Sequence, residues 1–360
     1  MHDNSMRSAL TRLPLKSTSF TCLTALTSLA RPAESFASSS LSLSSLNGQI
    51  CTSRRGRVTA TSFPAPRTGA ATKEYGSNSF QVRMATSLSS STKDGLFLFD
   101  FDGVVCDSCD ECTVSAWRTC KVLNAITEDA GDAPPQWLFD KMREIRPAIE
   151  VGWQIPVLLS VFLEQKANAT PSSPAMTVPE IIQNYEALVE NWLKTHNLKD
   201  GDMIQTFGQV RDDWISNDLN SWLDINTFYS GISQGITDCR GEAVLVTTKQ
   251  QRFATALVRH AGIETHAMAD DSIYGLGMYK SKSDVIVDRS QAGGFDNENT
   301  HFFEDRWPTI AKCLKDDRLE RVNFYLCSWG YCTEEELDLA ENEPRVEILK
   351  LNEFVKIVTK

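Results

Sequence analysis

The chain has 360 residues, of which 23% are charged, and a formal net charge of −11. This length exceeds what one hydrophobic core usually holds, so we expect two folded units or one unit with a tail. Residues 1–90 contain 10 of the 36 basic and 3 of the 47 acidic residues, which leaves 26 basic against 44 acidic residues and a net charge of −18 for residues 91–360. Such a surface repels a phosphate backbone, so binding to nucleic acid is disfavoured unless the ligand is a single nucleotide.

Residues 1–90 have the composition of a targeting segment. They contain 30 Ser and Thr, few acids and no periodic apolar face, which is typical of a plastid transit peptide. The sequence Gln81–Thr86 is similar to a stromal processing site, so we expect cleavage near Arg83 and a protein located in the chloroplast stroma. A secretory signal around 20–30 and simple disorder remain alternatives. No later stretch has the ~20 apolar residues of a membrane span, and we expect no membrane partner.

The folded part begins with a strand. Residues 96–99 form an apolar run that ends at Asp100, as expected for a strand buried on both faces of a parallel sheet. Four further strand candidates follow at 243–246, 301–303, 323–326 and 345–349. Between the first two of these, residues 249–261 have a helical apolar face and Gly262 as a typical stop. The alternation predicts an α/β fold, a doubly wound parallel sheet of Rossmann-like type.

The stretch 107–224 shows helical periods and no strand pattern. Apolar residues between 178 and 193 follow the spacing of a helix face, and Thr177 with Glu180 forms a capping-box pattern before them. Residues 167–177, rich in Ala, Ser, Thr and Pro, are predicted to be a loop. We therefore divide the folded part into a core, 91–106 and 225–360, and an all-helical insert, 107–224.

The strongest chemical signal is Asp100-Phe101-Asp102-Gly103, directly after the first strand. Two carboxylates flank one residue, and the glycine permits a sharp turn. This pattern suits nucleophilic attack by one carboxylate and proton transfer by the other. Two such carboxylates also occur by chance in solvated loops, but the buried strand before them makes that the weaker interpretation.

Further polar residues lie beyond the ends of the later strands: Thr247, Thr248, Lys249, Lys282, Glu304 and Asp305. The carboxyl ends of parallel strands share one edge of the sheet, which is where ligands bind in such folds. Each residue taken singly has a plainer interpretation. Thr247 is a plausible helix N-cap, and a lone lysine is more often a solvated surface residue.

Together, and in this order, these motifs resemble those of the haloacid dehalogenase superfamily, over about residues 96–351. The resemblance implies that Asp100 attacks phosphorus, and that Asp102 protonates the leaving oxygen and later activates water. It also implies that Thr247 hydrogen-bonds to the transferring phosphoryl group, with Thr248 as the second choice. Lys282 would neutralise its charge, and Lys280 could replace it.

The same resemblance implies a magnesium site. Glu304 and Asp305 match the acidic metal-binding motif, and Asp100 with the backbone carbonyl of Asp102 would complete the Mg²⁺ ligands. Four carboxylates facing one pocket repel one another by ~4 kcal/mol per close pair at an effective dielectric constant near 20. A divalent cation relieves this repulsion and stabilises charge during transfer.

The helical insert stands where this superfamily places its C1 cap, a lid over the site. The resemblance implies small soluble phosphate esters as substrates, with Arg146 and Arg211 of the insert, together with Thr248 and Lys249, as candidate substrate-binding residues. For the two arginines, salt bridges or packing within the helices are an equally good explanation. The segments 210–215, 246–254 and 303–306 are similar to a plant, algal and cyanobacterial branch.

Two features have no assigned chemistry. Cys106, Cys109 and Cys112 follow the first motif at C-x₂-C-x₂-C spacing; reduced, packed thiols are the default, with a soft-metal site or a regulatory disulfide as alternatives. The segment Ser328–Tyr331 follows a strand and is predicted to be a loop at the ligand-binding edge.

The leading hypothesis is Mg²⁺-dependent hydrolysis of a small phosphate monoester through a phosphoenzyme at Asp100. A phosphomutase on the same scaffold is the alternative enzyme, and a plastid protein that only binds a phosphorylated metabolite is the non-catalytic one. Dehalogenation is disfavoured because that chemistry has no use for Glu304 and Asp305. The sequence identifies neither the ester nor the oligomeric state.

Overall fold

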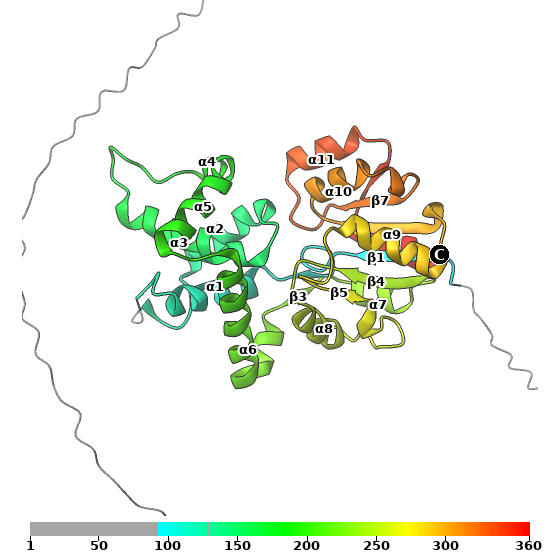
Figure 1. Cartoon of the computed structure of the whole chain (residues 1–360), viewed down its shortest axis with the longest axis horizontal. Helices are drawn as coiled ribbons and strands as arrows, with labels where there is room; N and C mark the ends of the chain where they lie inside the picture. Colours follow the sequence, from blue (N-terminus) through cyan, green and yellow to red (C-terminus); the bar gives the residue numbers. More distant parts are fainter. Residues whose placement is uncertain (1–92, 128–129) are drawn as a thin grey trace, which may run out of the picture. The chain divides into compact units, whose positions relative to one another are not determined.

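The computed structural model describes residues 93–127 and 130–360. The targeting segment expected in residues 1–90 lies outside them and stays a prediction. Six parallel strands form the main sheet in the order β5-β4-β1-β6-β7-β8 (Figure 1). They are β1 Leu96–Phe99, β4 Glu242–Val246, β5 Ile273–Tyr274, β6 Thr300–Glu304, β7 Asn323–Cys327 and β8 Val346–Leu349. The first strand of the chain therefore lies inside the sheet.

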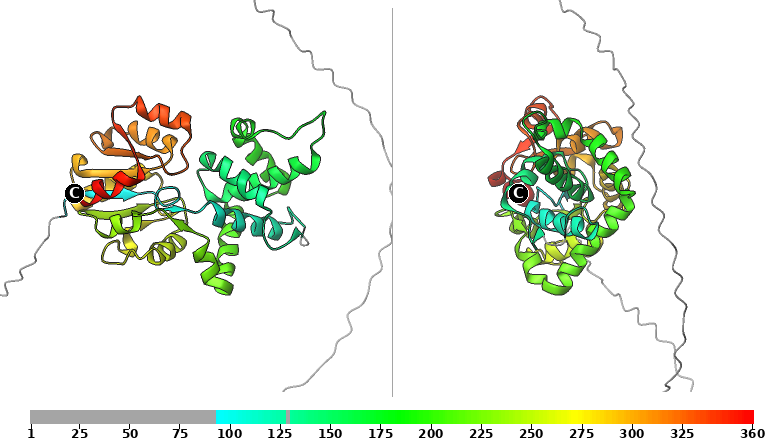
Figure 2. Two further views of the ribbon diagram at one scale, coloured as in Figure 1. Left: turned by 180° about the vertical axis from the view of Figure 1, so that it is seen from behind. Right: turned by 90° about the vertical axis from the view of Figure 1, so that its left-hand side faces the viewer.

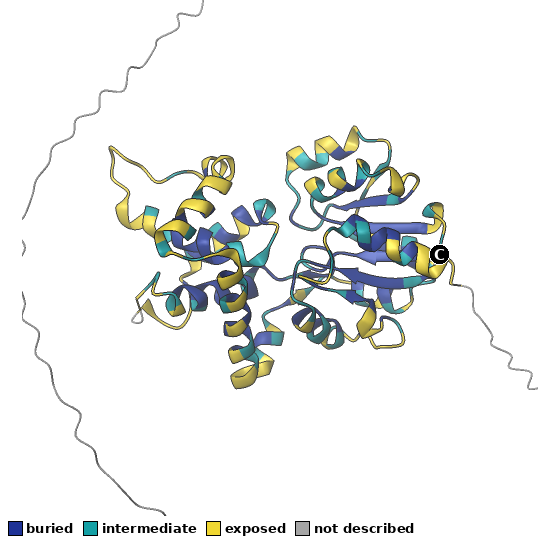
Figure 3. Ribbon diagram, viewed as in Figure 1, coloured by how far each residue is buried: buried dark blue, intermediate teal, exposed yellow. Residues whose placement is uncertain are grey.

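Strand β1 is apolar at every position because both of its faces are covered. Leu96 and Leu98 belong to the core on one side of the sheet, whereas Phe97 and Phe99 belong to the core on the other. All four side chains are 0% exposed. Figure 3 shows that the central strands of the sheet are buried, whereas the helices expose residues on the surface; the edge strand β8 is only partly buried.

Helices cover both faces of the sheet. On the side of Phe97 and Phe99 pack α7 Ile232–Thr237, α8 Gln251–His260 and α12 Leu351–Thr359, the last of which is red in the view from behind (Figure 2). On the side of Leu96 and Leu98 pack α9 Lys282–Gly293, α10 Trp307–Leu314 and α11 Glu334–Glu341. Short 3-10 turns are η4 Asp270–Ser272, η5 Asn297–Asn299 and η6 Asp317–Leu319.

A helical insert separates β1 from β4. Its helices are α1 Cys109–Val122, α2 Gln136–Ile145, α3 Ile155–Asn168, α4 Val178–Gln183, α5 Tyr185–His196 and α6 Asp200–Asp224, with 3-10 turns η2 Arg146–Ala148 and η3 Gly152–Gln154. The insert has its own apolar core, in which Trp117, Leu138 and Leu158 are buried. Helix α6 is interrupted at Asp218, whose φ and ψ are −155° and 80°. No helix in the described part of the chain is both long and apolar enough to cross a membrane.

The two connections between core and insert pair with each other. Strand β2, Cys106–Asp107, leaves the core and β3, Thr227–Phe228, re-enters it, and the two form a short antiparallel ribbon. The chain thus enters and leaves the insert at one place.

The α/β fold with a parallel sheet predicted from the sequence is confirmed. The capping box at Thr177 is also present, since Thr177 N donates to Glu180 Oε2 at 2.7 Å. Two expectations were incomplete. The apolar pattern over 178–193 is divided between α4 and α5 at Asn184, which has φ −105° and ψ 12°. Strand β5 was missed because it has only two residues.

One residue of β6 is expected to make stability depend on pH. His301 is buried, its ring stacks on Phe97 at 4.5 Å, and burial, aided by the charge of Arg240, lowers its pKa to about 4. The unfolded chain takes up a proton on His301 near pH 6.5, whereas the folded chain does not. The free energy of unfolding should therefore decrease as the pH drops from about 6.5 to 4. His301→Phe should flatten this slope in urea unfolding measured at pH 7.5, 6 and 5. Parallel slopes in variant and wild type would contradict the assignment.

Candidate active site

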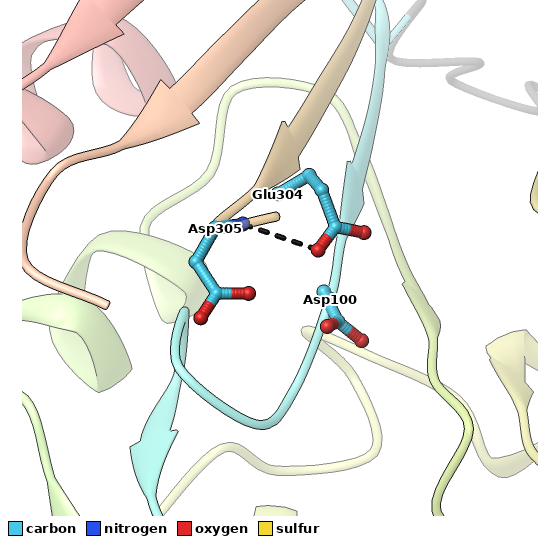
Figure 4. Close-up of side chains that lie close together, drawn as sticks. All are labelled: Asp100, Glu304 and Asp305. Carbon is cyan, nitrogen blue, oxygen red and sulfur yellow. Dashed lines mark hydrogen bonds between the residues drawn. The ribbon is translucent and has the colours of Figure 1, made fainter. Parts of the chain in front are cut away.

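Three carboxylates meet at the carboxyl ends of two neighbouring strands. Asp100 directly follows β1, Glu304 ends β6, and Asp305 follows it (Figure 4). One carboxylate oxygen from each of the three lies within 4.8 Å of the others. Within the described residues this is the only group of three or more His, Cys, Asp or Glu side chains with such spacing. The strand pairing of β1 with β6 aligns these ends, because Phe99 lies opposite Phe303.

The carboxylate cluster fits a hard divalent cation. Asp305 is 0% exposed, and its Oδ1 has no hydrogen-bond partner although it is buried. Burial, followed by the charges of Glu304 and Asp100, raises the pKa of Asp305 well above its usual range. An ion bound to oxygen ligands would satisfy the free atom and remove the repulsion. Without an ion, the cluster would have to take up a proton instead.

Lys282 provides the positive charge next to this cluster. It is the first residue of α9, and its Nζ lies 2.9 Å from Asp100 Oδ1 and 2.8 Å from Glu304 Oε2. Burial raises the pKa of Asp100 to about 7, even though Lys282 opposes this shift and Glu304 adds to it. Lys280 lines the same cleft, but no salt bridge of Lys280 is found among the described residues. Of the two candidate lysines, the structure therefore places Lys282 against the proposed nucleophile.

Asp102 is held by a different set of partners. Its Oδ1 lies 3.2 Å from Lys249 Nζ and accepts a short hydrogen bond from Ser108 Oγ. Burial opposes ionisation of Asp102, but Lys249, Arg146 and the Ser108 hydrogen bond outweigh it and lower its pKa. In the free protein this carboxyl group is therefore an anion at neutral pH.

Glu111, which no motif in the sequence singles out, connects the insert to this site. Glu111 is 0% exposed and accepts hydrogen bonds from Arg211 Nε at 2.7 Å and Arg211 Nη2 at 2.8 Å. Lys249 Nζ lies 3.6 Å from it on the core side, and Trp222 Nε1 also donates to it at 3.2 Å. The structure pairs Arg211 with Glu111 and also places it in the lining of a cleft, so its predicted contact with substrate stays a prediction.

The two threonines after β4 differ in their surroundings. Thr247 is fully buried, and its Oγ1 accepts a hydrogen bond from Lys249 N at 3.1 Å. The alternative role of Thr247 as N-cap of the following helix is wrong, because α8 has Gln250 as its N-cap. Thr248 lines both clefts at the site, and its Oγ1 donates to Glu150 O of the insert at 2.9 Å.

Two glycines allow the backbone to approach Asp305 closely. Gly103 has φ +90°, and a Cβ atom there would lie 1.8 Å from Asp305 Oδ2. At Gly330 a Cβ would lie 2.4 Å from Gly103 O. Tyr331 N donates to Asp305 Oδ2 at 2.7 Å, and Tyr331 Oη donates to Asp107 Oδ1 at 2.8 Å. The loop at Ser328–Tyr331, which had no assigned chemistry, thus positions a proposed metal ligand.

Two clefts open at this edge. One has about 1020 Å³ of empty space, part of it open to solvent, and is lined by Asp100, Lys282 and Glu304. The other is much narrower and is lined by Asp102, Lys249 and Arg146 among others. Thr248 and Glu150 line both. The proposed nucleophile and the proposed acid therefore face adjoining spaces.

The cysteines of the C-x₂-C-x₂-C segment behave as packed thiols. Cys106, Cys109 and Cys112 are buried and form no disulfide. Burial raises the pKa of Cys109 to about 12 and that of Cys106 well above its usual range. A protonated thiol is a poor nucleophile and a poor metal ligand, so the structure supports the default interpretation.

No protein-family model matches the chain, and no curated protein matches its sequence. Similar solved structures include a predicted phosphatase from Clostridium acetobutylicum, 16% identical over 73% of this chain and 97% of that chain, with a TM-score of 0.46. A predicted phosphoglycolate phosphatase from Haemophilus somnus is 14% identical over 74% of this chain and 98% of that chain, with a TM-score of 0.44. A haloacid dehalogenase-like hydrolase from Streptococcus pneumoniae is 15% identical over 74% of this chain and 99% of that chain, with a TM-score of 0.42. At these values the likenesses carry no conclusion about the activity of this chain.

Glu111→Gln should destabilise the protein strongly. The variant leaves the buried Arg211 without a carboxylate partner and Lys249 with Asp102 alone, and breaking a buried pair in this way costs about 3–5 kcal/mol of unfolding free energy. Because Arg211 and Lys249 lower the pKa of Glu111 despite its burial, this difference should be constant from pH 8 to 5 and shrink below about pH 4. Urea unfolding measures it, with Glu164→Gln as an exposed control on α3. Equal stability of the two variants would show that the buried pair contributes little.

Gly103→Ala should damage the carboxylate cluster. Its Cβ would overlap Asp305 Oδ2, so Asp305 has to move and the affinity for Mn²⁺ or Mg²⁺, measured by calorimetry, should fall. Gly262→Ala is the matched control, because Gly262 has φ +81° and a Cβ added there would meet no atom within 4 Å. Both variants carry strain of about 1–3 kcal/mol, but only the first should lose cation binding. Equal cation affinities would rule out a metal role for this turn.

Proposed function

We propose that this chain is a Mg²⁺-dependent phosphatase of the haloacid dehalogenase type, which hydrolyses a small phosphate monoester through a phosphoryl group carried on Asp100. One observation carries the proposal. A buried aspartate at a strand end lies 2.9 Å from a lysine and within 4.8 Å of two further carboxylates. This arrangement suits a nucleophile that has to approach an anionic phosphate.

In the first step, an Asp100 oxygen attacks phosphorus and the bond from phosphorus to the ester oxygen breaks. Lys282, beside Asp100, offsets the charge of the phosphoryl oxygens, and Thr248 stands at the junction of the two clefts. Asp102 gives its proton to the departing oxygen. Because Asp102 is ionised in the free protein, this proton must be taken up together with the substrate.

In the second step, water attacks phosphorus and the bond between Asp100 and phosphorus breaks. Asp102 now accepts the proton of the attacking water, and inorganic phosphate leaves with Asp100 restored as a carboxylate. Ser108 and Lys249 keep the Asp102 side chain in one orientation through both steps.

Mg²⁺, held by Asp100, Glu304 and Asp305, would offset the negative charge of the carboxylates and of the phosphoryl group. The free Oδ1 of Asp305 supports this ligand set. The insert would cover the site during turnover, since Thr248 and Lys249 of the core contact Glu150 and Glu111 of the insert. A covered site of this size favours small esters.

The test is phosphate release by the full chain from a panel of small phosphate esters, with Mg²⁺ or with EDTA. We expect release only with Mg²⁺, and a loss of at least about 10³-fold in kcat for Asp100→Asn, because the nucleophile is removed. Asp338→Asn, at an exposed position of α11, is the matched control and should keep full activity.

Release that survives Asp100→Asn would refute the phosphoenzyme. If no ester releases phosphate, but a phosphoryl group returns to a second substrate when a bisphosphate is added, the chain is a mutase. Binding of esters without either reaction would leave the non-catalytic alternative.

A further inference from the structure

Four cationic side chains are buried or nearly buried at the site, and three of them have a carboxylate partner. Lys282 lies against Asp100, Lys249 against Asp102, and Arg211 against Glu111. The fourth, Arg146 of η2, is 7% exposed and forms no salt bridge with any carboxylate in residues 93–127 or 130–360. A buried charge without a partner is costly and therefore rare.

The surroundings of Arg146 leave one edge of its guanidinium free. Its plane lies over the ring of Tyr331 at 4.3 Å, and Nη1 donates to Ile149 O at 3.2 Å. Nε is buried and has no hydrogen-bond partner. The contact with the Tyr331 ring restricts the orientation of the Arg146 guanidinium, and with it the direction in which the unpaired Nε points.

Arg146 lies in the cleft of the proposed general acid. It lines the smaller cleft together with Asp102, while Asp100 lines the neighbouring one. Asp102 would donate its proton to the oxygen of the leaving group, so whatever departs from phosphorus stays on this side. Trp153, Phe207 and Leu276 provide apolar surface in the same cleft.

We propose that Arg146 binds a carboxylate on the leaving group, so that the substrates are phosphate esters of small hydroxy acids. This inference rests on the phosphatase activity proposed above. A carboxylate would accept two parallel hydrogen bonds from the planar fork of an arginine, and it would supply the missing negative partner.

The charges in the cleft favour a carboxylate over a second phosphate group. Every other charged side chain of its lining has an opposite charge against it: Lys249 with Asp102, Arg211 with Glu111, and Glu150 with Lys312. Arg146 thus leaves one net positive charge. A carboxylate, with a single negative charge, neutralises it, whereas a phosphate group with nearly two would leave an excess of negative charge beside Asp102.

The test compares matched esters on the wild-type protein. The phosphate esters of 2-hydroxyacetate and 3-hydroxypropanoate are set against their methyl esters, which are one carbon longer and lack the carboxylate charge, and against ethane-1,2-diyl bisphosphate. We expect kcat/KM to be higher for the carboxylates than for the methyl esters by about 10- to 100-fold, the range of a charge-assisted hydrogen bond. The bisphosphate should be a poorer substrate than the carboxylates.

Variants of Arg146 should change the ratio of kcat/KM between carboxylate and methyl ester, and not only the overall rate. Arg146→Met should bring the ratio of carboxylate to methyl ester close to one, mainly through KM, and Arg146→Lys should restore part of it. Arg143→Met is the control, because Arg143 is half exposed on α2 and paired with Asp107 and Asp110 outside both clefts. It should keep the wild-type ratio. Thermal melting of each variant checks that it is folded.

An equal kcat/KM for carboxylate and methyl ester in the wild type, or a ratio that survives Arg146→Met, overturns the inference. A preference for the bisphosphate overturns the choice of carboxylate. Absence of phosphate release from every ester contradicts the phosphatase activity instead. In that case calorimetry with Asp100→Asn tests the carboxylate site without catalysis. Equal affinities of this variant for a carboxylate and its methyl ester would overturn the inference.

Discussion

The structure depends on two lysines, one buried and one nearly so, that offset carboxylates at one edge of the sheet. Lys282 lies against Asp100, and Lys249 lies between Asp102 and Glu111. Taking a charged group out of water costs several kcal/mol, and only a close opposite charge with good hydrogen bonds offsets this. Each lysine therefore offsets the cost of burying the ionised carboxylates beside it.

The second lysine also explains why the insert lies against the core. Glu111 belongs to α1 and Arg211 to α6, whereas Lys249 follows β4. The charge network is complete only when insert and core are together, because Glu111 needs a cation from each side. If the insert acts as the proposed lid, its closure over the site would also bury this network, so the lid would depend on electrostatics as well as on apolar contact.

Most of the fold could be predicted because the relevant signals are local. An unbroken apolar run such as 96–99 indicates a strand covered on both faces, and the strand ends then bring Asp100, Glu304 and Asp305 to one edge. The motif favours Lys282 over Lys280, and the structure agrees, since α9 starts after Ser281 and Lys282 lies against Asp100.

The parts that sequence reasoning missed depend on pairs that are far apart in the chain. Glu111 meets Arg211 a hundred residues later, and Tyr331 meets Asp107 across 224 residues. Nothing near Glu111 distinguishes it from an ordinary surface glutamate of a helix. Likewise, the free edge of Arg146 is visible only once Tyr331 is known to stack on it.

The place of β1 in the sheet has a consequence for how the chain folds as it is synthesised. Leu96–Phe99 is the first strand among the described residues, yet it pairs only with β4 and β6, whose partners for Leu96 are Glu242 and Thr300. This strand must therefore wait for more than a hundred further residues. During that time an apolar, unpaired strand is exposed, which is a recognised hazard for aggregation. The protein should therefore depend on chaperones mainly in the interval between the synthesis of its first strand and the arrival of the strands that enclose it.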